Sequence, residues 1–152
     1  MRNTERLLEH LGFLARKFSA SDLELVMVAL LMELGIPAKL TGYHFIKTAI
    51  LLYSGEQIGQ INKCLYEQIA ELHGANDSKK LVEAAVRDAI RAGWENREGN
   101  TWQCLLPGVK GVAVKPPSNH EFIAEMARVL ELWKYVCRSV ERKEQEVHYG
   151  AG

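Results

Sequence analysis

The side chains best placed to do chemistry are basic residues that recur at helical spacing between residues 78 and 94. If this stretch is a helix, one side of it and the margins of that side carry the candidate contact residues Lys79, Lys80, Glu83, Arg87 and Arg91. The opposite side is apolar and consists of Val82, Ala85, Val86, Ala89, Ile90 and Gly93. Lysine and arginine can contact the phosphates of a polyanion, and a glutamate can accept a hydrogen bond from the amino group of cytosine. The stretch therefore predicts an amphipathic helix with a buried apolar side and an exposed basic side.

A second helical pattern directly precedes this helix. It covers about residues 61–73 and stops at Gly74, and a short link follows in which Asp77 or Ser78 is the expected N-cap of the next helix. Two helices joined by a short glycine-containing link are typical of a helix-turn-helix, in which the second helix lies in the major groove of DNA. The commonest spacing of that motif calls for an apolar residue where this chain has Lys80, so we expect a longer link than the tightest version.

The basic side also has a plainer interpretation. Most surface helices have a charged side that contacts only solvent. Between residues 78 and 97 the chain has five basic and three acidic residues, which is a small excess for binding a duplex whose phosphates dominate the affinity. Periodicity alone leaves both interpretations open.

Four further helices complete an all-α prediction. They cover residues 4–18, 21–34, 41–53 and 118–140. Ser21-x-x-Glu24 and Ser118-x-x-Glu121 each match a capping box at a helix start, and Gly35 predicts a helix end. Residues 95–117 are rich in glycine and proline and predict a loop with at most a short strand or a helical turn. The polar tail from residue 141 is expected to fray.

Composition and charge narrow the class of protein. A chain of 152 residues with 47% hydrophobic and 25% charged residues has the length and composition of one globular domain. The 19 Lys and Arg residues balance the 19 Asp and Glu residues, so a polyanion must be met by a local basic patch. The sequence has no secretory signal, no apolar run of the roughly 20 residues that span a bilayer, and three cysteines without close spacing. We expect a cytoplasmic protein in a reducing compartment, with no membrane partner.

Catalytic and metal-binding motifs are absent from the sequence. The five histidines are scattered singly, and no nucleophile elbow, zinc-protease motif or glycine-rich phosphate loop occurs. Metal ligation by Cys64 with His73, or by His120 with Cys137, is a weaker interpretation than free thiols and surface or capping histidines. We therefore expect no enzyme activity, no cofactor and no metal.

Four motifs between Asp22 and Leu132 have the order and separations that are typical of one known family. They are Leu34-Gly35-Ile36-Pro37-Ala38 followed by Thr41-Gly42-Tyr43, then Leu65-Tyr66 with Ile69-Ala70, then Val82-Glu83 with Ala85, Arg87, Ala89-Ile90 and Trp94, and finally Lys115-Pro116 with Glu121-Phe122-Ile123-Ala124. Together they resemble the C-terminal DNA-binding effector domain of the sporulation-initiation master response regulator of spore-forming Firmicutes.

This resemblance implies a six-helix domain that contains a helix-turn-helix, preceded here by a short N-terminal helix, and that reads promoter DNA. It implies DNA contacts for Glu83 and Arg87, whereas two base-reading arginines of the family are replaced by Leu81 and Ala84. Their loss would weaken or redirect sequence choice, because an arginine bound to guanine through two hydrogen bonds contributes about 1–3 kcal/mol of discrimination. The family normally carries an N-terminal phosphorylatable receiver domain, for which the residues before Asp22 are too few. We expect a stand-alone relative that lacks the receiver, and the alternative is a truncated copy under other control.

We therefore expect a sequence-specific, double-stranded DNA-binding transcription regulator of the sporulation-initiation type. Its expected parts are an N-terminal helical arm over residues 1–18, a helix-turn-helix effector domain over 19–140 with a recognition helix at about 78–94, and a polar tail over 141–152. The resemblance implies that it acts at the nucleoid, as a homodimer on DNA and in contact with the sigma subunit of RNA polymerase. The alternative is a protein-interaction module of the same fold that binds a regulator or a polymerase subunit and has lost promoter reading.

Overall fold

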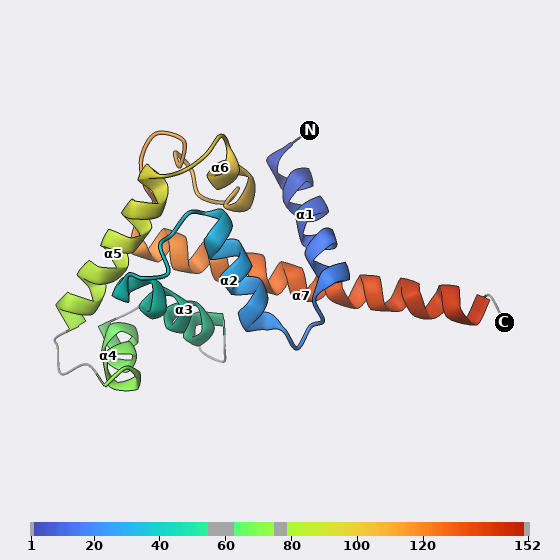
Figure 1. The fold of residues 1–152 in the computed structure, drawn as a ribbon, viewed down its shortest axis with the longest axis horizontal. Helices are drawn as coiled ribbons and strands as arrows, with labels where there is room; N and C mark the ends of the chain where they lie inside the picture. Colours follow the sequence, from blue (N-terminus) through green and yellow to red (C-terminus); the bar gives the residue numbers. More distant parts are fainter. Residues whose placement is uncertain (1, 55–62, 75–78, 151–152) are drawn as a thin grey trace.

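The computed structural model describes residues 2–54, 63–74 and 79–150, and helices joined by turns and loops make up this part of the chain (Figure 1). Its elements are α1 (Asn3–Lys17), α2 (Leu23–Glu33), α3 (Thr41–Ser54), α4 (Lys63–Leu72), α5 (Lys79–Glu95), α6 (Thr101–Leu105) and α7 (Asn119–Gly150). The described residues contain no strand, which confirms the all-α prediction of six helices preceded by a short N-terminal one.

Local capping chemistry accounts for one predicted helix start but not for the other. At the start of α7 the Ser118 N–H donates to Glu121 Oε1 and the Glu121 N–H donates to Ser118 Oγ, both at 3.1 Å, so this capping box is confirmed. The capping box predicted at Ser21 is wrong. Asp22 lies at the N-cap of α2 without a side-chain cap, because its carboxylate accepts a hydrogen bond from the Ser19 N–H at 3.0 Å instead.

Two predicted helix ends depend on glycine. Gly35 follows α2 with φ +75°, and Gly74 follows α4 with φ +64°, a left-handed backbone conformation that glycine adopts without a steric penalty. After Gly35 the Ile36 N–H donates to Leu31 O at 3.2 Å, which satisfies a carbonyl of the last turn of α2. Both stops are confirmed.

The segment between α5 and α7, for which the sequence left a loop with a short strand or a helical turn, contains one short helix. α6 is only five residues long, but Trp102 and Leu105 on it are buried. The Trp102 indole N–H donates to Leu34 O at 3.0 Å and so joins α6 to the end of α2. Tertiary packing of one tryptophan, rather than helical periodicity, holds this turn.

The end of α7 also differs from the prediction. Instead of fraying after residue 141, the helix continues to Gly150, and residues 141–146 are exposed. These residues are mostly glutamate, lysine and arginine, which have high helix propensity, and extending an existing helix costs much less free energy than starting one. The C-terminal turns of α7 project beyond the other helices in Figure 1.

One hydrophobic core connects the helices. α3 packs against both α5 and α7, and α1 packs against α7 and α6. Leu7, Leu11 and Leu14 of α1 are buried and belong to the same cluster as Trp133 and Cys137 of α7. α1 is therefore packed into the core of the fold.

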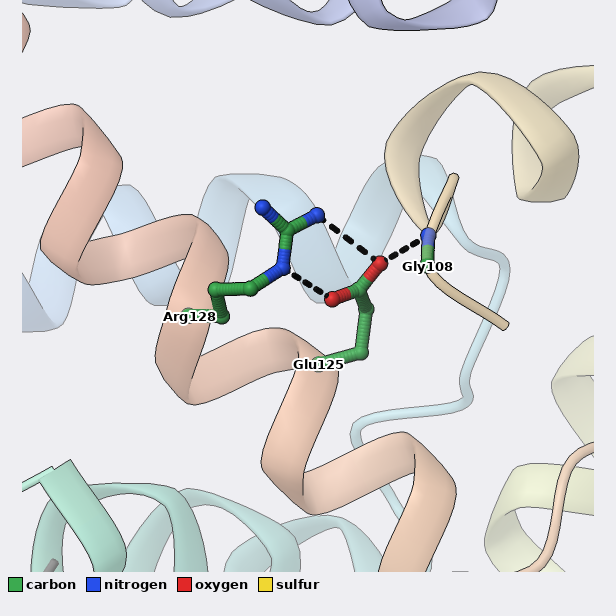
Figure 2. A network of polar contacts seen from close by, with 3 residues as sticks. All are labelled: Gly108, Glu125 and Arg128. Atoms are coloured by element: carbon green, nitrogen blue, oxygen red, sulfur yellow. Dashed lines mark hydrogen bonds and ion pairs between the residues drawn. The ribbon is translucent and has the colours of Figure 1, made fainter.

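Buried Glu125 anchors the segment that precedes α7 to α7 itself (Figure 2). Its carboxylate accepts hydrogen bonds from the Gly108 N–H and from the Arg128 guanidinium, whose Nη2 lies 3.0 Å from Oε2. This hydrogen bonding raises the pKa of Arg128 above its ordinary value, more than burial lowers it. Near the C-terminal end of α5, the Trp94 indole N–H donates to Val112 O in the same segment, at 2.7 Å. The segment that carries Lys115 is thus fixed to both α5 and α7.

Candidate nucleic-acid interface

The apolar side of α5 is buried as its periodicity predicts. Val82, Val86, Ala89, Ile90 and Gly93 are all buried, and Ala85 is half-buried. Gly93 is required by close packing, because a Cβ built there would lie 2.5 Å from Ile36 Cγ1 and 3.2 Å from Trp102 Cζ2. The helix is therefore held in a fixed rotation about its own axis, and that rotation decides which side chains reach solvent.

The structure places the predicted contact residues on the outer side of α5. Lys80, Glu83, Arg87 and Arg91 are exposed, and Lys79 is half-buried. Within the described ranges, none of the four cations forms an ion pair with an acidic side chain. Their charge is not neutralised by the rest of the described fold.

The two helices of the predicted helix-turn-helix pack against each other as α4 and α5. Tyr66, Ile69 and Ala70 of α4 are buried in the common core. The link over residues 75–78, together with its predicted N-cap at Asp77 or Ser78 and its predicted extra length, lies outside the described residues.

A close approach of α3 to α5 fixes the position of α5 in the fold. A Cβ built on Gly42 in the first turn of α3 would lie 2.0 Å from Ala85 O and 2.8 Å from Ala89 Cβ. Real Cβ contacts essentially never fall below 3.0 Å. Only glycine at residue 42 permits the two helices to cross this closely. Contact with the backbone of α3 therefore fixes the position of α5.

A groove of about 550 Å³ runs between α5 and the start of α7. It is lined by Tyr66, Glu83, Arg87 and Arg91 on one side and by residues 115–121 on the other. Lys115 thus joins Arg87 and Arg91 around one hollow, although it lies more than twenty residues further along the chain. Glu83 and Glu121 are the acidic residues of the groove lining, and the carboxylate of Glu121 is engaged in the capping box of α7.

The Asn119 side chain joins the two walls of this groove. Its Nδ2 donates to Glu83 O at 3.0 Å and to Tyr66 Oη at 3.3 Å, and so connects α7, α5 and α4. Burial raises the pKa of Tyr66 above its ordinary value of 10.0; the hydrogen bond from Asn119 acts in the opposite direction, and the charge of Glu83 adds to the rise. Tyr66 therefore keeps its proton at neutral pH, and the junction between the three helices stays uncharged.

The sequence pattern identified the contributions of α5 to this groove and missed the other wall. The missed residues are Lys115, Pro116, Pro117, Ser118, Asn119 and His120. The capping box at Ser118 marks where α7 starts, but no spacing in the sequence shows that this start lies across from Arg87. α5 also exposes an apolar side chain in its first turn, since Leu81 has 55% of its surface accessible.

Other kinds of site find little support in the described part of the chain. No group of three or more histidine, cysteine, aspartate or glutamate side chains there could hold a metal ion. His73 Nε2 lies 2.7 Å from Thr48 Oγ1, and His10 Nε2 lies 2.8 Å from Glu33 Oε1, so both rings have partners within the fold. The described helices include none with the length and apolar composition needed to cross a membrane.

A comparison with protein families gives one match over more than half of the chain. The family model described as "Sporulation initiation factor Spo0A C terminal" matches residues 27–130. The matched range begins in α2, contains all of α3 to α6 and both walls of the groove, and ends within α7. α1 and the rest of α7 lie outside the match. The family is one of non-enzymatic, DNA-binding effector domains. On this match, the chain belongs to the family of Spo0A C-terminal domains.

Proposed function

We propose that this protein is a sequence-specific regulator of transcription that binds double-stranded DNA with α5 in the major groove. The observation that carries the proposal is the arrangement of charge on α5. Its apolar side is buried and three of its four cations are exposed. Arg87 and Arg91 share a groove with Lys115 from a distant part of the chain. The family match over the same residues supports it.

The two walls of the groove suit the sugar-phosphate backbone of a duplex. Phosphate contacts supply most of the affinity of DNA-binding proteins and fix their register, and they require cations held at defined positions. Arg87, Arg91 and Lys115 provide three such cations, and the Asn119 bridge holds the two walls together. Because the net charge of the chain is +0, this local cluster has to supply the attraction.

Glu83, in the N-terminal half of α5, is assigned to a base. The residues at the start of a recognition helix are those that commonly reach base edges. Glu83 is exposed there and can accept a hydrogen bond from the N4 amino group of cytosine. Lys79 and Lys80 lie in the first turn and are assigned to phosphates. The proposed DNA contacts are therefore Lys79, Lys80, Glu83, Arg87 and Arg91, and we add Lys115 because it lines the same groove as the two arginines.

We also propose a division of the whole chain into parts and a set of partners. We place the helix-turn-helix effector domain at residues 19–140, a helical arm at 1–18 and a polar tail at 141–152. By analogy with the family we propose that the protein acts at the nucleoid in sporulation, binds as a homodimer and contacts the sigma subunit of RNA polymerase. The buried leucines of α1 indicate that the arm packs on the effector domain.

Selection of bound sequences from a library of random duplexes tests the proposal. The full chain should enrich one sequence motif. Replacing Arg87 and Arg91 together by alanine should abolish the enrichment without unfolding the protein, since both side chains are exposed. The matched control replaces Arg138 and Arg142, two exposed arginines near the other end of α7, and should keep it. Failure of the unaltered chain to enrich any motif would refute the proposal.

A protein-interaction module is the second candidate function, and the exposed leucines of the helix-turn-helix favour it. Leu72 at the end of α4 and Leu81 in α5 have 66% and 55% of their surface accessible. Such side chains suit an apolar partner surface better than they suit phosphates. This candidate predicts that purified RNA polymerase holoenzyme retains the chain and that Leu72→Asp abolishes retention, while no duplex is enriched.

A further inference from the structure

Leu81 is an apolar side chain at a position where the proposed recognition helix should meet the bases. It lies in the first turn of α5 and has 55% of its surface accessible. Ala84, one turn after Leu81, is half-buried. Leu81 and Ala84 are three residues apart and therefore adjoin on the helix surface. Together they form an uncharged apolar step on the surface of α5.

The surroundings of Leu81 indicate that this step does not contact phosphate. Arg87, Arg91 and Lys115 line the groove at the start of α7, and Leu81 is not part of that lining. Asp88, seven residues after Leu81 and so on the same side of α5, is exposed and acidic. An apolar side chain followed by a carboxylate would gain nothing from a phosphate and would repel it. The Leu81 side of α5 therefore suits a base edge better than it suits the phosphate backbone.

Only one base presents an apolar group in the major groove. The edges of guanine, cytosine and adenine offer hydrogen-bond donors and acceptors, whereas thymine adds a C5-methyl group. A leucine can bury that methyl group, and the small side chain of Ala84 one turn later allows the helix to come close enough. We propose that Leu81 is a specificity-determining residue that selects thymine through its C5-methyl group. This inference rests on the proposed function and assigns part of the sequence that the protein reads.

Replacing thymine by deoxyuracil tests this contact, because the substitution removes the methyl group and keeps the base pair. In the duplex motif that the full chain selects, each thymine is replaced singly and the dissociation constant is measured. Burial of one methyl-sized group corresponds to a change of about fourfold in affinity. We expect the unaltered protein to bind one deoxyuracil duplex about fourfold more weakly, and we expect Leu81→Ala to bind the two duplexes equally.

Leu25→Ala is the matched control. Leu25 lies on α2 and has the same 55% of its surface accessible as Leu81, so both substitutions remove an exposed leucine and should leave the fold intact. Circular dichroism and a urea titration check this. Leu25→Ala should discriminate thymine from deoxyuracil as the unaltered protein does.

The outcomes separate this inference from the proposed function. Selection of a motif without any thymine that responds to loss of its methyl group would overturn the inference and leave the function in place. Retention of the fourfold ratio by Leu81→Ala would do the same. Absence of any selected motif would overturn both.

Discussion

The substitution Gly42→Ala should act on α5 through the backbone of α3. The added Cβ would lie 2.0 Å from Ala85 O and 2.7 Å from Ala85 C, whereas ordinary contact begins at 3.4 Å. Both atoms belong to the backbone of α5, so no side-chain rotation can relieve the clash, and the two helices must separate by roughly 1.4 Å. Overpacking of this kind costs about 1–3 kcal/mol. We expect the free energy of unfolding to fall by that amount.

Gly12→Ala provides a control of identical chemistry. Gly12 lies within α1, and the nearest atom to a Cβ built there is the flexible Arg16 Nη1 at 3.9 Å. Because alanine has a higher helix propensity than glycine, this variant should gain about 0.5–1 kcal/mol. Urea unfolding followed by circular dichroism measures both changes, with the urea dependence of the free energy checked for equality between variants. Folded Gly42→Ala should also bind DNA more weakly, since its α5 is displaced. Equal effects of the two substitutions on stability would refute the proposed role of Gly42.

Three further expectations concern what holds the interface in place. Leu11→Ala should cost about 2–5 kcal/mol of stability in urea unfolding, because Leu11 is fully buried, whereas Leu8→Ala, at 42% exposure on the same helix, should stay within about 1 kcal/mol; equal costs would show that α1 is not part of the core. Glu125→Gln should cost about 1–3 kcal/mol, because a charged carboxylate that accepts from Gly108 and Arg128 is replaced by a neutral amide with one acceptor oxygen, and an unchanged urea midpoint would contradict this. Because folding raises the pKa of Tyr66, the unfolded chain loses the tyrosine proton at a lower pH than the folded protein does, so the free energy of unfolding should fall as the pH rises above 10.0. It should fall less steeply in Tyr66→Phe, and equal slopes in the two proteins would contradict this expectation.

Periodicity predicted most of what the structure shows for α5. Helical spacing separated the buried residues from the exposed ones, and it did so correctly because burial of one side of a helix leaves a local imprint on the sequence. The stop at Gly35 and the capping box at Ser118 were predictable for the same reason, since the backbone conformation or the bonding partner lies within a few residues.

Features that depend on residues distant in the sequence were not predictable. α6 exists because Trp102 packs in the core and bonds to Leu34, and five residues are too few for a periodic signal. The capping box at Ser21 failed because a competing contact between Ser19 and Asp22 replaces it. No residue near Lys115 in the sequence indicates that it lies opposite Arg87. Its position depends on the hydrogen bonds of Trp94 and Glu125, which hold the segment before α7 against α5 and α7. One wall of the groove therefore became visible only in the structure.

The dependence of duplex binding on salt tests the central claim most directly, namely that the exposed cations of α5 contact the phosphates of a duplex. A protein that binds in this way releases condensed counterions, so its association constant falls steeply as salt rises. Replacing Arg87 by alanine should lower that slope by about one if Arg87 holds a phosphate, or weaken binding by about 1–3 kcal/mol if it reads a guanine. Arg138→Ala at the other end of α7 should do neither. Binding that is independent of salt, or a titration that Arg87→Ala leaves unchanged at two salt concentrations, would contradict the account.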